Sequence, residues 1–184
     1  VLHVNTLDFG GAAQAAYRFH RGLLQLGCAS EMLVSHCRTS DPAVMRFLPR
    51  MGLFPRIVRR VRRHVIGGDL AKYRGAPSPN SVGMFSDDRS RFQGELVEKL
   101  PACDVVNLHW VAGFVDYRSF FKLVSARTPI VWTLHDMNPF TGGCHYDYGC
   151  GKFTTRCGSC PQLKSDNPED LSFKIWERKT SAFA

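Results

Sequence analysis

The stretch "TLHD", residues 133–136, places two residues that can do chemistry, His135 and Asp136, directly after an apolar run. A histidine can donate a hydrogen bond or a proton near neutral pH, and a neighbouring carboxylate can orient it or its loop. The stretch therefore predicts a catalytic edge. The simpler alternative is a histidine that is hydrogen-bonded to the backbone and serves only the fold.

Four cysteines follow with the spacing Cys144-x5-Cys150-x6-Cys157-x2-Cys160. Four thiolates suit tetrahedral zinc, and the closing Cys-Gly-Ser-Cys is typical of half a zinc knuckle. The first pair is spaced more widely than in a standard zinc ribbon, so an iron–sulfur cluster, disulfides and free thiols stay open as alternatives. His145 is a candidate substitute ligand. The other three cysteines lie in apolar surroundings and are expected to be buried thiols.

Two further motifs follow apolar runs that are expected to be strands. Gly10 and Gly11 let a backbone approach a ligand closely, and the helix predicted after them offers free N–H groups to phosphate. They form neither a dinucleotide fingerprint nor a Walker loop, so a plain turn is the alternative. His109 and Trp110 could face a sugar, or could be a capping histidine and a core tryptophan.

The elements that must position these residues alternate between strand and helix. The expected strands cover 1–5, 30–36, 104–110 and 129–136, and the expected helices cover 12–26, 91–100, 117–127 and 168–184. This order predicts an α/β, Rossmann-like fold with an open, mostly parallel sheet and helices on both faces. Ligands of such sheets bind beyond the carboxyl ends of the strands, where the strand-end motifs should meet.

Residues 40–95 interrupt this rhythm with an irregular segment that contains the basic amphipathic helix "FPRIVRRVRRHVIGG". Its apolar face could lie on an anionic membrane, its arginines could follow a nucleic acid, or the arginines could be solvated while the apolar face covers the domain's own core. The formal net charge of +8 favours an anionic partner. No helix-turn-helix, RNA-binding or finger signature accompanies the helix, so the membrane is favoured and no nucleic acid is expected.

The bulk composition fits one globular domain over residues 1–184, with a cysteine-rich insertion over 137–165. We expect a truncated chain, because it opens inside an apparent strand and closes inside an apparent helix. There is no apolar run of roughly 18 residues, so no membrane-spanning helix is expected. The clustered cysteines favour a metal site over a secreted disulfide framework. For the same reason they favour a cytoplasmic location.

The stretches "GGAAQAAYRFHRGLLQLG", "DVVNLHW" and "PIVWTLHDMNPFTGGCHY", with the cysteines that follow, resemble bacterial family 4 glycosyltransferases. The resemblance is to enzymes of exopolysaccharide or lipopolysaccharide synthesis, of the colanic-acid type. It covers nearly the whole chain and is weakest over residues 40–95. It implies a GT-B fold of two Rossmann-like domains, of which this chain resembles the N-terminal, acceptor-side one.

The resemblance also implies roles for single residues. Gly10 and Gly11 match a loop that approaches the donor diphosphate and the acceptor, and His135 matches a histidine near the transferred sugar. Asp136 would orient His135 or its loop, and His109 with Trp110 would contact substrate. Such enzymes retain the sugar's configuration and need no divalent metal for catalysis, so zinc at the cysteines would be structural.

The implied partners are a nucleotide-sugar donor and a saccharide or polyprenyl-linked acceptor. The sequence holds no Glu-x7-Glu motif in a context that fits the donor-binding motif of the C-terminal domain. The basic helix over residues 53–66 would hold the enzyme on the inner face of the cell membrane. The competing hypothesis is a zinc-stabilised basic module that binds nucleic acid or membrane without catalysis.

Overall fold

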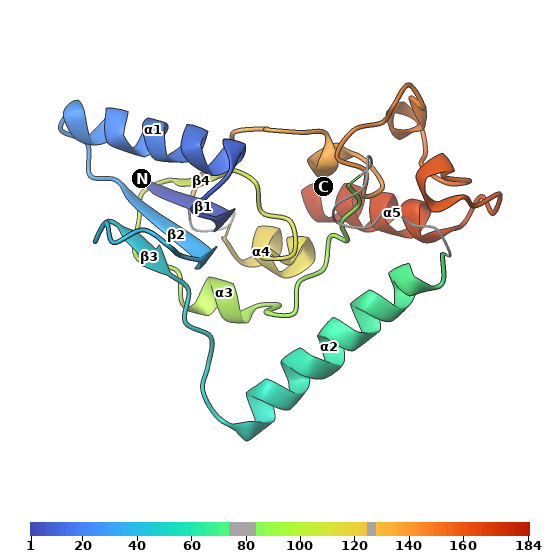
Figure 1. The fold of residues 1–184 in the computed structure, drawn as a ribbon, viewed down its shortest axis with the longest axis horizontal. Helices are drawn as coiled ribbons and strands as arrows, with labels where there is room; N and C mark the ends of the chain where they lie inside the picture. Colours follow the sequence, from blue (N-terminus) through green and yellow to red (C-terminus); the bar gives the residue numbers. More distant parts are fainter. Residues whose placement is uncertain (74–83, 125–127) are drawn as a thin grey trace.

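A parallel β-sheet forms the centre of the computed structural model, which describes residues 1–73, 84–124 and 128–184. Within these residues the sheet has five strands in the order β3-β2-β1-β4-β5, and every neighbouring pair is parallel (Figure 1). The predicted α/β fold with an open parallel sheet is confirmed. The strands are β1 (Leu2–Leu7), β2 (Glu31–His36), β3 (Val44–Arg46), β4 (Val106–Leu108) and β5 (Ile130–Trp132).

The strand order reverses at β1. After β1 the chain moves outward through β2 and β3, and it returns on the other side of β1 to form β4 and β5. In the register, Val4 lies opposite Leu33 of β2 and Leu108 of β4. The loops that leave β1 and β4 therefore diverge at the carboxyl edge, which is where a parallel sheet binds its ligands.

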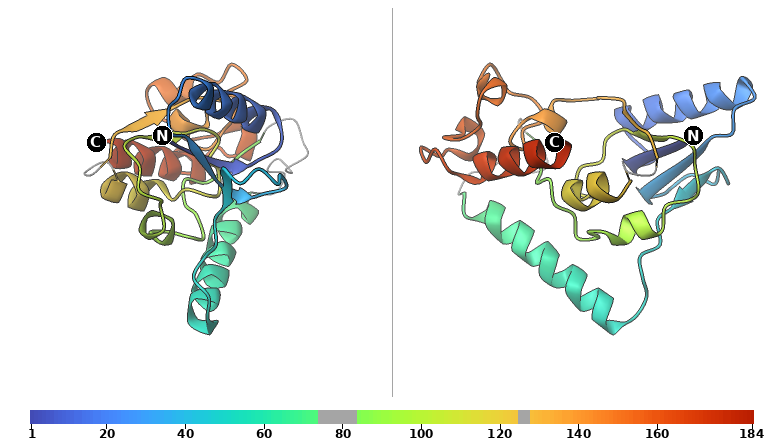
Figure 2. Two further views of the ribbon diagram at one scale, coloured as in Figure 1. Left: turned by 90° about the vertical axis from the view of Figure 1, so that its left-hand side faces the viewer. Right: turned by 180° about the vertical axis from the view of Figure 1, so that it is seen from behind.

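Helices cover both faces of the sheet (Figures 1 and 2). Helix α1 (Gly11–Gln25) contacts β1 and β2 and buries Ala13, Ala16 and His20. On the opposite face α3 (Glu95–Glu98) and α4 (Tyr117–Val124) contribute to the main core, and α5 (Leu171–Phe183) lies against α4. That core includes Leu2, Val4, Leu96, Val106, Phe114 and Phe120.

Several elements are shorter than the sequence predicts. The helix expected over 91–100 is only the single turn α3, because Gln93 has a positive φ of 50° and Pro101 follows closely. β4 and β5 end at Leu108 and Trp132, so His109 and Thr133–Asp136 lie just beyond the paired strands. The Pro/Ser/Gly-rich residues 74–88 are typical of a loop, and most of them (74–83) lie outside the described residues, as do the last residues (125–127) of the helix expected over 117–127.

Helix α2 (Leu53–Ala71) forms as predicted, but its polar side faces the domain and its apolar side faces outward, the reverse of a core helix. Arg59 forms an ion pair with Glu95 at 3.0 Å and Arg62 with Asp116 at 2.9 Å, so part of its arginine side faces the domain. None of its residues is buried, and it projects from the rest of the chain (Figure 2). Its exposed apolar side chains are Leu53, Phe54, Ile57, Val58, Val61 and Val65.

The interpretation of α2 as a helix whose apolar face covers the domain's own core is therefore wrong. The ion pairs of Arg59 and Arg62 fix the polar side inward, which leaves the apolar stripe without a partner in the described part of the chain. The same part of the chain contains no helix long and apolar enough to cross a membrane.

The cysteine segment lies beside α5 and contains three short helices, η1 (Asn138–Phe140), η2 (Lys152–Thr154) and η3 (Pro161–Leu163). Asp170 connects the cysteine segment to α5 through hydrogen bonds. One carboxylate oxygen accepts from the N–H groups of Ser172 and Phe173 and so caps the helix, and the other accepts from the N–H of Cys160 at 2.8 Å. The buried Lys179 of α5 donates to the carbonyl of Asn138 and, at 3.2 Å, to that of Thr141.

Candidate functional site

The predicted site residues gather at one edge of the sheet. Gly10 follows β1, His109 and Trp110 follow β4, and His135 and Asp136 follow β5 (Figure 1). Gly10 is the N-cap residue of α1 and has φ +90°, a backbone conformation that favours glycine, and both it and Gly11 are exposed. Within the described residues the glycine turn shares this edge with the other four residues but makes no hydrogen bond to them.

The two histidines belong to a buried row that starts in β1. His3 Nδ1 lies 2.9 Å from His109 Nε2, and His109 Nδ1 lies 3.0 Å from His135 Nε2. The rings of His109 and His135 are stacked with centroids 5.3 Å apart, and His20 of α1 lies beside His3. His3 and His109 are fully buried, whereas His135 is half-buried at the outer end of the row.

This burial keeps the row uncharged near neutral pH. Burial, reinforced by His20, lowers the pKa of His3 to about 4, and burial with the charges of His3 and His135 lowers the pKa of His109 to about 3. Burial also lowers the pKa of His135, while Asp136 acts in the opposite direction. A neutral imidazole donates through one nitrogen and accepts through the other, so the tautomer of His109 sets that of His135.

Of the two roles predicted for Asp136, orienting His135 or orienting its loop, the hydrogen bonds favour the loop. Its Oδ2 accepts hydrogen bonds from Trp110 Nε1 at 2.8 Å and from His145 Nδ1, and its Oδ1 accepts from the N–H of Asn138 at 2.9 Å. Burial alone would raise its pKa, but the hydrogen bonds from His145, Asn138 and Trp110 hold that pKa below the ordinary value. Asp136 thus joins the end of β5 to the cysteine segment and makes no hydrogen bond to His135.

His145 is not available as the zinc ligand that its position allows. Besides its Nδ1 contact with Asp136, its Nε2 lies 2.9 Å from the hydroxyl of Ser86, and the residue is 1% exposed. Both ring nitrogens are therefore occupied. The physical reason is the loop after β5, which places His145 behind Trp110 with ring centroids 5.6 Å apart.

The four clustered cysteines do come together. Cys144, Cys150, Cys157 and Cys160 all line one cavity of about 20 Å³ beside α5. A hydrogen bond between the thiols of Cys144 and Cys160 lowers the pKa of Cys160 to about 6 and raises that of Cys144. Over the described residues, no group of three or more His, Cys, Asp or Glu side chains has the arrangement of a ready-made metal site. Zinc therefore stays a prediction.

The remaining cysteines differ from expectation. Cys28 is exposed, and Cys37 and Cys103 are half-buried, so the prediction of three buried thiols is wrong. Cys28 lies in the turn that follows α1 rather than on a face of the sheet, which explains its exposure.

The cavity at the histidines is too small for a sugar. It measures about 10 Å³ and is lined by His109, Trp110, His135, Asp136 and His145 among others, which leaves room for about one water molecule. His109 lies behind His135 and does not face the outside. Any substrate at this edge would meet the half-buried His135 rather than His109.

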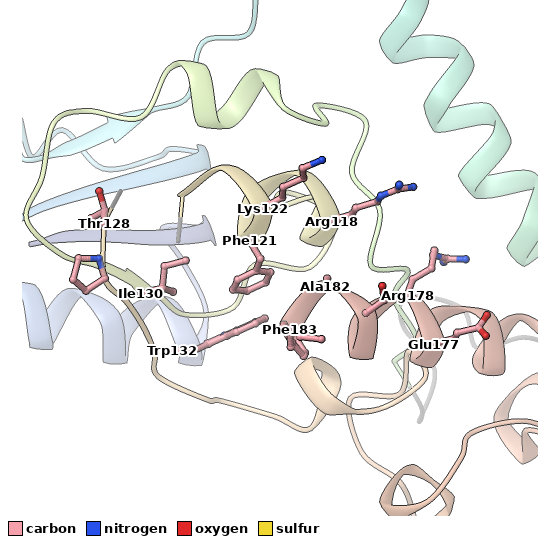
Figure 3. A pocket seen from close by; sticks show the side chains of 13 residues that line it. Arg118, Phe121, Lys122, Thr128, Ile130, Trp132, Glu177, Arg178, Ala182 and Phe183 are labelled. Atoms are coloured by element: carbon pink, nitrogen blue, oxygen red, sulfur yellow. The ribbon is translucent and has the colours of Figure 1, made fainter. Parts of the chain in front are cut away.

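A cavity of about 1230 Å³ lies beside β5 and between α4 and α5 (Figure 3). Figure 3 shows the rings of Phe121, Trp132 and Phe183 close together, with Arg118 and Lys122 on α4. None of the predicted site residues lines this cavity.

Another cavity, of about 350 Å³, lies at the carboxyl edge of the sheet and has no counterpart in the sequence predictions. Thr6 of β1, His36 of β2 and Gly113 after β4 contribute to its walls. The other contributors include Arg63 of α2 and two arginines, Arg89 and Arg91, of the segment before α3. These residues come from distant parts of the chain, so no local motif marks the cavity.

Comparison with known proteins supports the relationship that the motifs predict. The chain is 29% identical over 175 residues to a protein of Escherichia coli K12 whose name, still provisional, is colanic acid biosynthesis glycosyl transferase WcaC. The alignment covers 91% of this chain and 41% of that protein, so the chain spans less than half of its relative. No family model and no solved structure matches the chain. The chain is therefore similar in sequence, over most of its length, to a glycosyltransferase of the colanic-acid type.

Proposed function

We propose that this chain is the acceptor-side domain of a retaining, family 4 glycosyltransferase with a GT-B fold. The enzyme would transfer a sugar from a nucleotide-sugar donor to a saccharide or polyprenyl-linked acceptor during synthesis of a cell-surface polysaccharide. The observation that carries the proposal is the position of His135, half-buried at the carboxyl edge and hydrogen-bonded to a buried histidine. The similarity to the colanic-acid enzyme supplies the reaction class.

In this proposal His135 is the catalytic residue. As a neutral imidazole it hydrogen-bonds a hydroxyl of the transferred sugar and adjusts its tautomer as charge develops. His109 and His3 are positioning residues, because they lie behind His135 and fix its ring through hydrogen bonds of 3.0 and 2.9 Å. Asp136 positions the loop through Trp110 and Asn138.

The glycine turn and a second domain complete the proposed mechanism. Gly10 and Gly11 stand at the start of α1 with no atom within 4 Å of an added Cβ, so a diphosphate can approach the backbone there. A C-terminal domain would hold the nucleotide-sugar donor. Catalysis would require no metal ion.

The test is sugar transfer by the full-length protein carrying His135→Ala. We expect turnover to fall about 100-fold or more with folding unchanged, because a hydrogen bond made in the transition state is lost. The matched control is Leu134→Ala, which removes an exposed neighbouring side chain and should retain activity. Activity equal to the wild type in the His135→Ala variant would contradict the catalytic role of His135.

His109→Gln separates positioning from contact. Its amide can still hydrogen-bond but does not reproduce the flat ring, so kcat should fall while KM for the acceptor stays near its original value. An effect on KM alone would instead assign His109 to acceptor binding.

We also propose that one zinc ion joins the four clustered cysteines. Their shared cavity beside α5 supports this, and Gly149 and Gly151 on either side of Cys150 have positive φ angles, which suit a tight ligand loop. Purified protein should contain about one zinc per chain, and Cys157→Ser should lose it, whereas Cys28→Ser should not. A metal-free, folded protein would refute the proposal.

Helix α2 is the proposed membrane contact, on the inner face of the cell membrane. Its apolar stripe is exposed, and Arg56 and Arg60 are exposed on the same helix. Arginines next to an apolar stripe suit an anionic lipid surface. The alternative use of α2, along a nucleic-acid backbone, is disfavoured because Arg59 and Arg62 are held in ion pairs with the domain.

A further inference from the structure

The cavity of about 350 Å³ at the carboxyl edge has the composition of an anion site. Three guanidinium groups line it, those of Arg63, Arg89 and Arg91. Among the described residues, no aspartate or glutamate lines it. Its volume falls near the lower end of the range for small-molecule pockets, roughly 300 to 1,000 Å³.

The three arginines differ in their partners. Arg89 forms ion pairs with Asp87 at 2.7 Å and with Asp69 at 2.9 Å, so its charge is balanced within the protein. Arg63 and Arg91, in contrast, have no carboxylate within ion-pair distance in the described part of the chain. Two of the three positive charges at this cavity are therefore left without a counterion from the protein.

The surroundings of Arg91 make an anion favourable there. Glu95, the acidic residue that faces α2, is already paired with Arg59 at 3.0 Å. The guanidinium carbon of Arg91 lies 4.7 Å from the ring centroid of Phe92, a contact that leaves the charge unbalanced. Burial, reinforced by the charges of Arg63 and Arg59, lowers the pKa of Arg91. A bound anion would offset both the burial and the repulsion between like charges.

The segment that carries Arg91 is held in place before any ligand binds. The hydroxyl of Ser90 donates to the carbonyl of Gly113 at 3.1 Å and accepts from the N–H of Phe92 at 3.2 Å. The N–H of Ser90 donates to Asp116 Oδ2, also at 3.2 Å. A ligand therefore meets an ordered backbone, which reduces the entropy that binding would otherwise cost.

The donor groups of the cavity suit a carboxylate better than a phosphate. Proteins commonly hold phosphate with backbone N–H groups at a helix N-terminus or in a turn. Arg63 and Ile66 instead come from the middle of α2, and Gly10 at the start of α1 is not a lining residue. The paired N–H groups of a guanidinium match the two oxygens of a carboxylate. Arg91 is half-buried and Arg63 is exposed, so one negative charge balances the arginine that has lost water.

The other walls of the cavity fit a sugar ring. Ile66 and Phe92 supply apolar surface for the C–H groups of the ring, and Thr6 and Ser35 supply hydroxyl groups. Thr6 of β1 also places the cavity at the point where the strand order reverses, which is the edge that carries His135. An anionic sugar bound here would lie on the same side of the sheet as the candidate site.

We propose that this cavity binds the carboxylate-bearing sugar of an acidic saccharide, with Arg63 and Arg91 holding the carboxylate. The proposal rests on the function proposed above, in which this domain holds the acceptor, and it adds that the acceptor contains an acidic sugar. The two arginines would then determine acceptor specificity, because a neutral sugar leaves both guanidinium groups without an anion.

Calorimetric binding of hexuronates to the full-length protein tests the cavity. The probes are glucuronate, galacturonate and mannuronate, each compared with its parent hexose, and acetate represents the bare carboxylate. We expect at least one hexuronate to bind about tenfold more tightly than its hexose and than acetate, because only the hexuronate uses both the arginines and the sugar walls.

Arginine variants show whether this binding occurs in the cavity. Arg63→Gln and Arg91→Gln should each weaken the hexuronate about tenfold, since each removes a charge-assisted hydrogen bond. Arg63 is exposed, so its variant should fold normally, which circular dichroism checks. Arg56→Gln is the matched control, because Arg56 is an exposed arginine of α2 that does not line the cavity, and it should bind normally.

Three outcomes overturn the proposal. Equal hexuronate binding by the wild type and Arg63→Gln, or no hexuronate binding at all, would mean that the cavity takes no acidic sugar. Acetate binding as tight as that of every hexuronate would indicate a site for free anions. Arginine-dependent binding of inorganic phosphate or uridine diphosphate, without binding of a hexuronate, would assign the cavity to phosphate.

Sugar transfer measured on the same samples separates this proposal from the proposed function. Normal transfer by the Arg63→Gln and Arg91→Gln variants, with no hexuronate bound by the wild type, refutes the cavity assignment and leaves the glycosyltransferase standing. Arginine-dependent hexuronate binding without sugar transfer by the wild type keeps the acidic-sugar site and contradicts the proposed function.

Discussion

Helices α1 and α2 are both amphipathic, yet the molecule uses their apolar sides in opposite ways. Helix α1 buries Ala13 and Ala16 against the sheet, and the buried His20 lies beside His3. Helix α2 buries nothing and turns two arginines inward to Glu95 and Asp116. The comparison shows that helical periodicity predicts an apolar side, whereas the residues on neighbouring elements decide what that side contacts.

The largest difference between the two helices should appear when one charge is placed on the apolar side of each. Ala16→Asp puts a carboxylate against Met32, Val34 and Val44 and should lower the free energy of unfolding by about 3–5 kcal/mol. Val61→Asp on the exposed stripe should change it by less than about 0.5 kcal/mol. Urea unfolding measures both. A large loss in the α2 variant would show that something covers the stripe in solution.

The next largest effect concerns the histidines beneath α1. The folded pKa values of His3, about 4, and His109, about 3, lie below the ordinary value of 6.5. Between the folded pKa values and 6.5, the unfolded chain binds more protons than the folded chain does. The stabilisation present above pH 6.5 is therefore lost as the pH falls towards 4. Urea unfolding should show a loss on the order of 3 kcal/mol between pH 6.5 and 4.5.

His3→Asn provides the check on this assignment. The variant should be less stable near pH 7 but should show a shallower loss on acidification, because one buried imidazole is gone. An unchanged pH slope would mean that other groups cause the acid sensitivity.

The third test concerns what the apolar stripe of α2 binds. The double change Ile57→Ser and Val61→Ser should weaken binding to vesicles with anionic lipid about tenfold, because apolar area no longer leaves water. Leu26→Ser is the matched control, since this side chain at the end of α1 is 79% exposed but belongs to no such stripe. Sedimentation with vesicles measures both. Equal binding to uncharged vesicles would contradict the role of the arginines.

The smallest effect should come from the ion pairs that hold α2. Glu95→Gln breaks a pair whose side chains are only 14% and 11% exposed and should cost about 1–2 kcal/mol while loosening α2 in hydrogen exchange. Glu98→Gln removes the partner of Arg50, where both side chains are more than half exposed, and should cost less than about 0.5 kcal/mol. If the two variants behaved alike, the Glu95 pair would not anchor the helix.

The parallel sheet and its covering helices were predictable because each strand is a short apolar run followed by a turn and a helical repeat. The position of His135 at the carboxyl edge follows from that pattern, and so does the glycine at the start of α1, whose φ is positive. The sequence predicts the ends of β4 and β5 a few residues too far along the chain, because backbone pairing stops before the apolar runs end.

The histidine row was not predictable as a unit. His3 and His20 lie in ordinary strand and helix patterns, and only the register of β1 with β4 brings His3 to His109. One signal was present: His3 and Asn5 interrupt a strand that is buried on both faces, where apolar residues are the norm. Such polar residues need partners, and the partners mark the site.

The arginine cavity could not be found from the sequence for a related reason. Arg63, Arg91 and Thr6 are far apart along the chain, and none belongs to a motif. Arginines of α2 look equivalent on a helical wheel, yet Arg62 is paired with Asp116 and Arg63 is not. Only tertiary contacts separate Arg62, which holds the helix, from Arg63, which has no carboxylate partner among the described residues.

The inward arginines of α2 have a consequence for how such a protein would search for its substrate. Ion pairs with the domain fix the helix's apolar stripe outward, so the proposed binding to a bilayer would need no refolding of the helix. A protein held in this way would diffuse in the same plane as a lipid-anchored molecule. Encounters then occur in two dimensions, and their frequency depends on the amount of each per area of membrane rather than per volume of cell.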